Sequence, residues 1–183
     1  MIGNSILFSE MVPDASYEAE FNDWYDREHI PLRMGVPGFH SAQRYVVPGT
    51  RHYLAIYEME SPAVLKTPAY QEVKNNPSER TRWMLRTVGG FTRYIAEQIH
   101  APEIEAIDAP CIHAVFSNEP HHSPKDCLMV RRFRIVDGEP EKWTHLALYY
   151  LADSIGLPSV FAKHGVRQWN SNLESSTPLS NTR

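Results

Sequence analysis

The sequence predicts an α+β fold in which a β-α-β-β-α-β unit is followed by a shorter second repeat. Strand-like and helix-like segments alternate in this order over about the first 100 residues. Short strand-like runs from this unit then recur later in the chain. The linker Asn118–Lys125, with two prolines, marks where the second repeat is shorter than the first.

The first unit is delimited by turn and cap residues. Tyr17, Phe21, Trp24 and Tyr25 repeat at helical spacing, and Pro31 is expected to end this helix near His29. Pro48–Arg51 predicts a hairpin between two strands. Strands are expected at residues 5–12, 39–47, 52–60 and 91–99, and helices at 16–29 and, interrupted by Asn75-Asn76-Pro77, between 61 and 87. This order is that of the ferredoxin-like, or split βαβ, unit.

The second repeat rests on two echoes in the sequence. Arg44–Gly49 is matched by Arg132–Gly138, and Leu54–Tyr57 is matched by Leu146–Tyr149. We interpret these echoes as a diverged duplication. The alternative is a chance likeness between short hairpin strands.

The copy lacks one element of the original. Between its expected strands Cys111–Ser117 and Asp126–Val136 lies only Asn118–Lys125, which is too short and too proline-rich for the helix of the first unit. We therefore expect residues 1–105 to form the domain with the candidate site and residues 106–170 a truncated repeat without its first helix. The polar residues 171–183 are expected to be a frayed tail.

Composition narrows the functional classes. The chain has 18 basic and 22 acidic residues, a net charge of −4, and no basic block, which argues against nucleic acid as a partner. The N-terminal residues have no signal-peptide pattern, and no apolar run is long enough for a membrane helix. Cys111 and Cys127 show no metal-site or disulfide spacing, so we expect reduced thiols and a cytoplasmic location.

The chemistry is expected at the end of the first helix. On a wheel of 100° per residue, Glu28 falls in the middle of the apolar stripe and His29 falls on its flank beside Tyr25. A carboxylate on a buried face tends to have a raised pKa, which suits a catalytic acid or base. His29 lies in the last expected turn, where the helix dipole favours its charged form. Glu28 and His29 are therefore the candidate catalytic residues.

Each candidate also has a structural interpretation. Glu28 could form a buried ion pair with Arg44 or Arg93, and His29 could bond the carbonyl groups at the helix end. Trp24 and Tyr25 are expected as core or as pocket wall.

Further candidates lie outside this helix. Arg44 could bind an anionic substrate oxygen instead of pairing, and His113 could face the same cavity if the two sheets pack together. His121 and His122 have no third ligand at useful spacing, so we predict a solvated loop and no metal site. The sequence has no nucleotide-binding, esterase or zinc-protease motif, and no cofactor is expected.

The segment Trp24–Leu32, with Val36–Phe39 and Ala42–Tyr45, resembles the EthD-type branch of the dimeric α/β-barrel superfamily. In that branch an aromatic-x-x-x-His-x-Pro pattern ends the first helix, and a Pro-Gly turn leads into the second strand. The resemblance covers about residues 1–100 and implies that His29 is the motif histidine and that Trp24 and Tyr25 line a pocket. A second histidine further upstream in the helix is absent here, so a mechanism with two histidines is not expected.

The resemblance also implies a range of activities. We expect a cofactor-free isomerase, cyclase, dehydratase or other lyase that transfers a proton on a small hydrophobic, oxygenated substrate, aromatic or enolisable in character. The alternatives are a cofactor-independent monooxygenase acting on a phenol and a non-catalytic ligand-binding or stress-response protein. The second repeat could cover the open face of the first sheet within the chain. The polar tail and the missing helix leave exposed edges that a two-fold dimer could protect, so a homodimer is expected.

Overall fold

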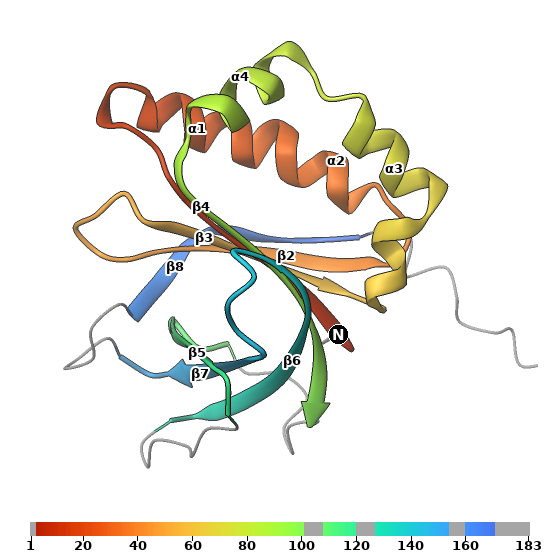
Figure 1. Ribbon diagram of the computed structural model, residues 1–183. Coiled ribbons are helices and arrows are strands. Elements are labelled where there is room, and N and C mark those ends of the chain that lie inside the picture. Colours follow the sequence, from red (N-terminus) through yellow and green to blue (C-terminus); the bar gives the residue numbers. More distant parts are fainter. Residues whose placement is uncertain (1–2, 101–107, 120–126, 154–159, 171–183) are drawn as a thin grey trace, which may run out of the picture.

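Eight strands form one closed antiparallel barrel (Figure 1). The computed structural model describes residues 3–100, 108–119, 127–153 and 160–170. The strand order is β1-β3-β2-β8-β5-β7-β6-β4, and β4 pairs with β1 to close the barrel. The strands are β1 (Ser5–Val12), β2 (Phe39–Val46), β3 (Tyr53–Met59), β4 (Gly89–His100), β5 (Cys111–Ser117), β6 (Met129–Glu139), β7 (His145–Leu151) and β8 (Val160–Trp169).

The labelled helices lie together on one side of the barrel, over the strands of the first half (Figure 1). A continuous helical segment joins β1 to β2, and a second helical region joins β3 to β4. The helices are α1 (Glu18–Trp24), a π-helical turn (Tyr25–His29), α2 (Ile30–Met34), α3 (Pro68–Asn75) and α4 (Glu79–Thr87), with 3-10 turns at Ala15–Tyr17 and Pro62–Lys66.

The predicted fold class, a ferredoxin-like unit followed by a degenerate repeat, is wrong. The strands of the first half have the order β4-β1-β3-β2, but this sheet is not open: β2 pairs with β8 and β4 pairs with β6. An unpaired strand edge leaves backbone hydrogen-bonding groups without partners, and the second half satisfies them here. The local hairpin prediction is confirmed, because β2 and β3 pair antiparallel. The division at residue 105 stays a prediction.

Alternation along the strands separates two hydrophobic layers. Leu54 and Ile56 of β3 point into the barrel, whereas Tyr53, Ala55 and Tyr57 point towards the helices. The barrel interior also takes Phe133 of β6 and Leu148 of β7. The helix-facing layer is therefore a second core, with one wall made by β1–β4 and the other by the helices.

One expectation can be checked over the described residues, and two others concern segments outside them. No helix in the described ranges is both long and apolar enough to cross a membrane. The expected tail at 171–183 and the histidine pair His121-His122 lie outside the described residues.

A buried ion pair joins the two halves inside the barrel. Arg131 of β6 is fully buried, and its Nη1 lies 2.6 Å from Oε1 of Glu58 on β3, while its Nη2 lies 3.1 Å from Oε2. Arg131 also donates hydrogen bonds to Oε1 of Gln98, to the hydroxyl of Tyr150 and to the carbonyl oxygen of Gly3. Burial alone would lower the pKa of the Arg131 guanidinium, but Glu58 and Tyr150 outweigh this effect, so the pKa is raised and the guanidinium stays charged.

Removing one member of this pair should be costlier than removing both. We expect Glu58→Leu to lower the free energy of unfolding by roughly 3–5 kcal/mol, because it leaves an uncompensated buried charge. The double variant Glu58→Leu/Arg131→Met should recover at least half of that loss, since two apolar side chains replace the pair. Urea unfolding of the single and double variants measures both values. A double variant that loses the sum of the two single losses would contradict this account.

Candidate functional site

The helix between β1 and β2 passes through a π-helical turn at Tyr25–His29. The backbone N–H of Ile30 donates to the carbonyl of Tyr25, five residues earlier, which is the π-helical pattern. Pro31 does not end the helix as expected; it lies in the first turn of α2, where a missing N–H is tolerated. Because a π turn rotates each residue by less than 100°, the wheel shifts its phase at this point. His29 is consequently 5% exposed and faces the core.

His29 lies in an aromatic pocket. Its ring centroid is 4.3 Å from that of Trp24 and 4.9 Å from that of Tyr25. Nδ1 lies 3.3 Å from Nη1 of Arg33. A guanidinium only donates hydrogen bonds, so Nδ1 is the acceptor and the neutral ring carries its hydrogen on Nε2.

The electrostatics of the pocket keep His29 neutral. Burial lowers the pKa of His29 well below its usual value, and the positive charges of Arg33 and Arg44 lower it further. The expectation that the helix dipole favours a charged ring does not hold, because the helix continues to Met34 and the ring is buried. The pocket therefore has a positive potential, which comes from the two guanidiniums, while the imidazole of His29 carries no charge.

The sheet beneath the helix presents hydroxyl groups around a small residue. Ala55 of β3 lies opposite Ser9 of β1 and opposite Arg44 of β2, and Tyr53 and Tyr57 flank it along the same strand. These side chains share the helix-facing side of the sheet. The small side chain of Ala55 therefore forms a floor that is surrounded by polar groups.

Tyr25 reaches down to this floor from the π-helical turn. Burial raises the pKa of Tyr25, and Arg44, Arg33 and the nearby hydroxyls of Tyr57 and Ser9 partly offset that effect. The pKa of Tyr57 is raised well above its usual value, chiefly by burial and then by Tyr25. Both phenols are thus protonated donors. Among the described residues the buried Tyr57 hydroxyl makes no hydrogen bond of normal geometry, although it lies near the Tyr25 hydroxyl.

Arg44 is buried at the edge of this pocket and pairs with Asp26, not with Glu28. Its Nη1 donates to Oδ1 of Asp26 at 2.8 Å, and its Nη2 donates to Oδ1 of Asn22 at 2.5 Å. The guanidinium carbon lies 4.7 Å from the centre of the Tyr25 ring. The third donor, Nε, is buried without a partner.

Glu28 lies apart from His29 and joins the first helix to α4. Its Oε1 accepts from the hydroxyls of Ser78 and Thr81, and Thr81 in turn accepts from Nε1 of Trp24 at 2.9 Å. Ser78 is the N-cap residue of α4. The structure thus places Glu28 in a helix-docking network, so a catalytic role for it stays an untested prediction with no geometric support.

His113 also lies apart from the others. On β5, Ile112, Ala114 and Phe116 belong to the barrel interior, whereas Cys111 and Val115 belong to an outward-facing cluster. His113 shares that outward side and stacks on Tyr149 at 6.3 Å. The structure brings together His29, Trp24, Tyr25 and Arg44, but neither Glu28 nor His113.

Several residues of the pocket were not among the sequence candidates. Tyr57 and Ser9 lie on predicted strands, but nothing in one sequence shows that their hydroxyls lie near Tyr25. His164 of β8 lies 5.2 Å from the Tyr53 ring, and its pKa is lowered by burial and then by Arg44. No sequence signal places this distant strand beside the first helix.

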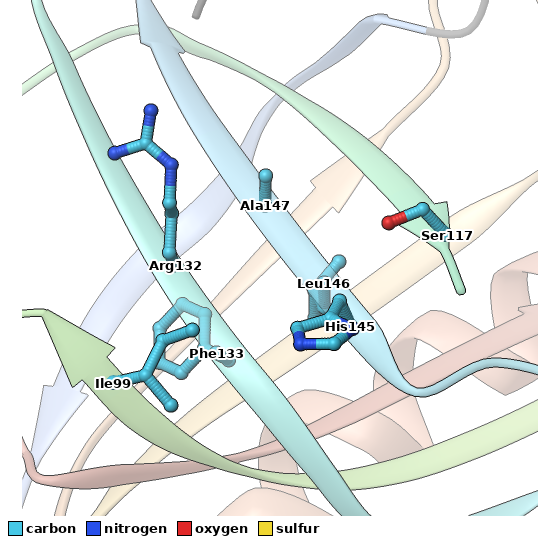
Figure 2. Close-up of a pocket in the computed structure, with 7 residues that line it drawn as sticks. All are labelled: Ile99, Ser117, Arg132, Phe133, His145, Leu146 and Ala147. Atoms are coloured by element: carbon cyan, nitrogen blue, oxygen red, sulfur yellow. The ribbon is translucent and has the colours of Figure 1, made fainter. Parts of the chain in front are cut away.

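Two described cavities lie elsewhere. One, of about 410 Å³, is lined by Tyr94 of β4 and by the β6–β7 connection, including Trp143. Figure 2 shows the other, where Arg132, Ala147 and His145 lie on adjacent strands. Its volume of about 20 Å³ suits roughly one water molecule. Neither of these two cavities is lined by His29. Among the described ranges, no three metal-ligating side chains gather into a site.

Comparison with known proteins identifies the fold. No family model matches the chain, and no curated protein matches its sequence. The crystal structure of an anthrone oxidase-like protein matches with a TM-score of 0.63 at 8% identity, over 91% of this chain and 93% of that chain. A "Putative monooxygenase" from Fusobacterium nucleatum subsp. nucleatum ATCC 25586 matches with a TM-score of 0.50 at 12% identity, over 84% and 78% of the two chains.

At these identities the likeness shows a shared fold alone. The superfamily named in the sequence resemblance therefore stays a prediction. The EthD branch is not confirmed.

The neutral state of His29 should be measurable through stability. Unfolding returns the His29 pKa to about 6.5, so below that pH the unfolded chain binds a proton that the folded chain does not. The folded state is therefore destabilised as the pH falls below about 6.5, and above it His29 contributes no pH dependence. When the pH falls from about 7.5 to about 5.5, the free energy of unfolding of the wild type should drop by about 1.4 kcal/mol more than that of His29→Gln. Denaturant unfolding at both pH values tests this, and equal losses in the two proteins would contradict a buried neutral His29.

Proposed function

We propose that this chain is a small enzyme that transfers a proton on an aromatic or enolisable substrate with a polar oxygen. The observation that carries the proposal is His29, a buried neutral imidazole against Trp24 and Tyr25, held at Nδ1 by Arg33. Perturbed titratable groups in such surroundings are typical of functional sites. The π-helical turn that positions His29 and Tyr25 supports the same proposal, because π turns occur often at functional sites.

The pocket residues fit distinct roles in such a reaction. Trp24 and Tyr25 would hold an aromatic ring by stacking, and Arg44 and Arg33 would favour an anion formed from the substrate. His29 would take up or return the proton. In the present arrangement it offers an N–H from Nε2, and accepting a proton at Nδ1 requires Arg33 to release that atom.

Entry of a substrate requires a local rearrangement. Arg44 is 2% exposed, whereas the carboxylate of its partner Asp26 is 43% exposed at the rim. A shift of Arg44 or of the π-helical turn would open the pocket from this rim. We expect such opening to be part of the catalytic cycle, as loop movements are in many enzymes.

A second candidate reaction is cofactor-independent oxygenation of the same kind of substrate. The names of the two structural neighbours favour it. Both reactions begin with removal of a proton to give a resonance-stabilised anion. They differ in whether that anion is then reprotonated or reacts with dioxygen.

Proton transfer can be measured without knowing the product. We propose anthrone as the probe, because it is enolisable and because one neighbour is named anthrone oxidase-like. In D₂O without oxygen, the protein should accelerate deuterium incorporation at the acidic C–H, followed by NMR. His29→Ala should slow this exchange by about 100-fold or more, the usual scale for losing an acid–base group.

His145→Ala, at the start of β7, is the control and should keep the wild-type rate. Oxygen uptake in air, measured in parallel, separates the two candidate reactions. If related phenols and β-keto compounds bind to the wild type, yet exchange is the same with wild type and His29→Ala, the chain is a binding protein and this proposal is wrong.

The assembly state is a separate proposal. We propose a homodimer, for which the outward apolar residues of β8 give some support: Val166 is 87% exposed and Trp169 is 55% exposed. Light scattering at low micromolar concentration should give twice the chain mass of 21.0 kDa. A single species of the chain mass would reject the dimer.

A further inference from the structure

Two buried hydrogen-bond donors in the aromatic pocket make no hydrogen bond of normal geometry with any described residue. They are the hydroxyl of Tyr57, whose side chain is 1% exposed, and Nε of Arg44, whose side chain is 2% exposed. A buried donor without a partner is costly, and such groups are rare in folded proteins. Both donors therefore call for an acceptor that is not part of the described chain.

The two donors lie around the same floor. Tyr57 is opposite Ala42 of β2, and Arg44, two residues further along β2, is opposite Ala55. The two side chains are thus diagonal neighbours on one face of the sheet. Ala42 and Ala55 contribute only methyl groups between them, so an acceptor atom could reach both donors from the helix side.

The charge of the surroundings selects an anion. Arg44 and Arg33 both lower the pKa of His29, which shows that their positive potential extends through the pocket. Asp26 and Asn22 engage two nitrogens of Arg44 and leave Nε free. Because the pKa of Tyr57 is raised, its hydroxyl remains a donor at neutral pH and does not compete as an anion.

We propose that Tyr57 Oη and Arg44 Nε bind the ionised oxygen of a phenol or enol, so that the site takes its substrate as an oxyanion. This inference deepens the proposed function and rests on the same pocket. In the ionisation the substrate O–H bond breaks, the electron pair stays on oxygen, and the proton leaves to His29 or to water. The anion then accepts one hydrogen bond from each donor.

The probe is 4-nitrophenol, whose ionised form is coloured. Bound to the wild-type chain, it should ionise at a pH at least about one unit below that of the free compound, because nearby positive charges favour the anion. Tyr57→Phe should weaken binding of the anion about tenfold, which is the scale of a hydrogen bond to a charged group. Binding of 4-nitroanisole, which has no ionisable hydroxyl, should change less than about twofold in the same variant.

The second half of the barrel offers a matched control. Ala147 and Tyr149 are two residues apart on β7, as Ala55 and Tyr57 are on β3. Arg132 lies opposite Ala147, just as Arg44 lies opposite Ala55. Tyr149→Phe and Arg132→Met should therefore bind 4-nitrophenolate as the wild type does, with one site per chain.

Stability separates binding from a structural role. Tyr57→Phe should lower the melting temperature little, because the Tyr57 hydroxyl makes no hydrogen bond of normal geometry among the described residues. Tyr53→Phe should lower it, because that hydroxyl donates to Glu18 at 2.7 Å and accepts from Asn22 at 3.1 Å.

His29→Gln distinguishes this inference from the proposed function. It should keep the colour shift of bound nitrophenol even though it abolishes proton exchange. The inference is overturned if the wild type does not bind nitrophenol, if the bound compound stays neutral, or if Tyr57→Phe and Tyr149→Phe weaken the anion equally.

Discussion

The Arg131–Glu58 pair inside the barrel is the constraint on which the position of the candidate site depends. Successive residues of a strand point to opposite faces, and Glu58 must point inward to meet Arg131. Tyr57 must then point outward, towards the helices. A slip of β3 by one residue would place a carboxylate against the aromatic helix and a phenol against Arg131. The ion pair thus fixes the register that carries Tyr53, Ala55 and Tyr57 to the pocket.

The backbone of Gly3, just before β1, makes hydrogen bonds with both members of this ion pair. Its N–H donates to Oε2 of Glu58, and its carbonyl accepts from Arg131. A Cβ atom at this position would lie 2.4 Å from the carbonyl oxygen of Met59, closer than backbone atoms allow. Only glycine brings the backbone close enough to complete the network, so the chain just before β1 is held against β3.

Local features of the structure were predictable from the sequence, and contacts between distant segments were not. The helix with Trp24, Tyr25 and His29 follows from apolar spacing, and the β2–β3 hairpin follows from its turn residues. The π-helical turn does not, because a regular wheel assumes a constant rotation per residue. That assumption placed Glu28 on the buried face, where the structure places His29.

Barrel closure also lay beyond the sequence pattern. The alternation in β2 and β4 indicates strands with one face towards a core, but it does not indicate which strand pairs with each free edge. The interior polar residues carry part of the answer, since an arginine on the core face of a strand requires a partner. Glu58 and Arg131 form that pair, yet they are far apart in the sequence. The residues next to each one do not distinguish it from an ordinary surface charge.

The second half shows why the arrangement of the sheet alone does not make a site. It repeats the pattern Arg132, Ala147 and Tyr149, and the small pocket over Ala147 in Figure 2 includes Arg132. Residues 13–38 connect β1 to β2 and supply Trp24, Tyr25 and His29, whereas only residues 118–128 connect β5 to β6. The shorter connection cannot supply a helix of that length with an aromatic wall. A cationic and phenolic floor therefore occurs twice among the described residues, but Trp24 and Tyr25 pack around a buried histidine over the first floor, so the chemistry is expected in the first half.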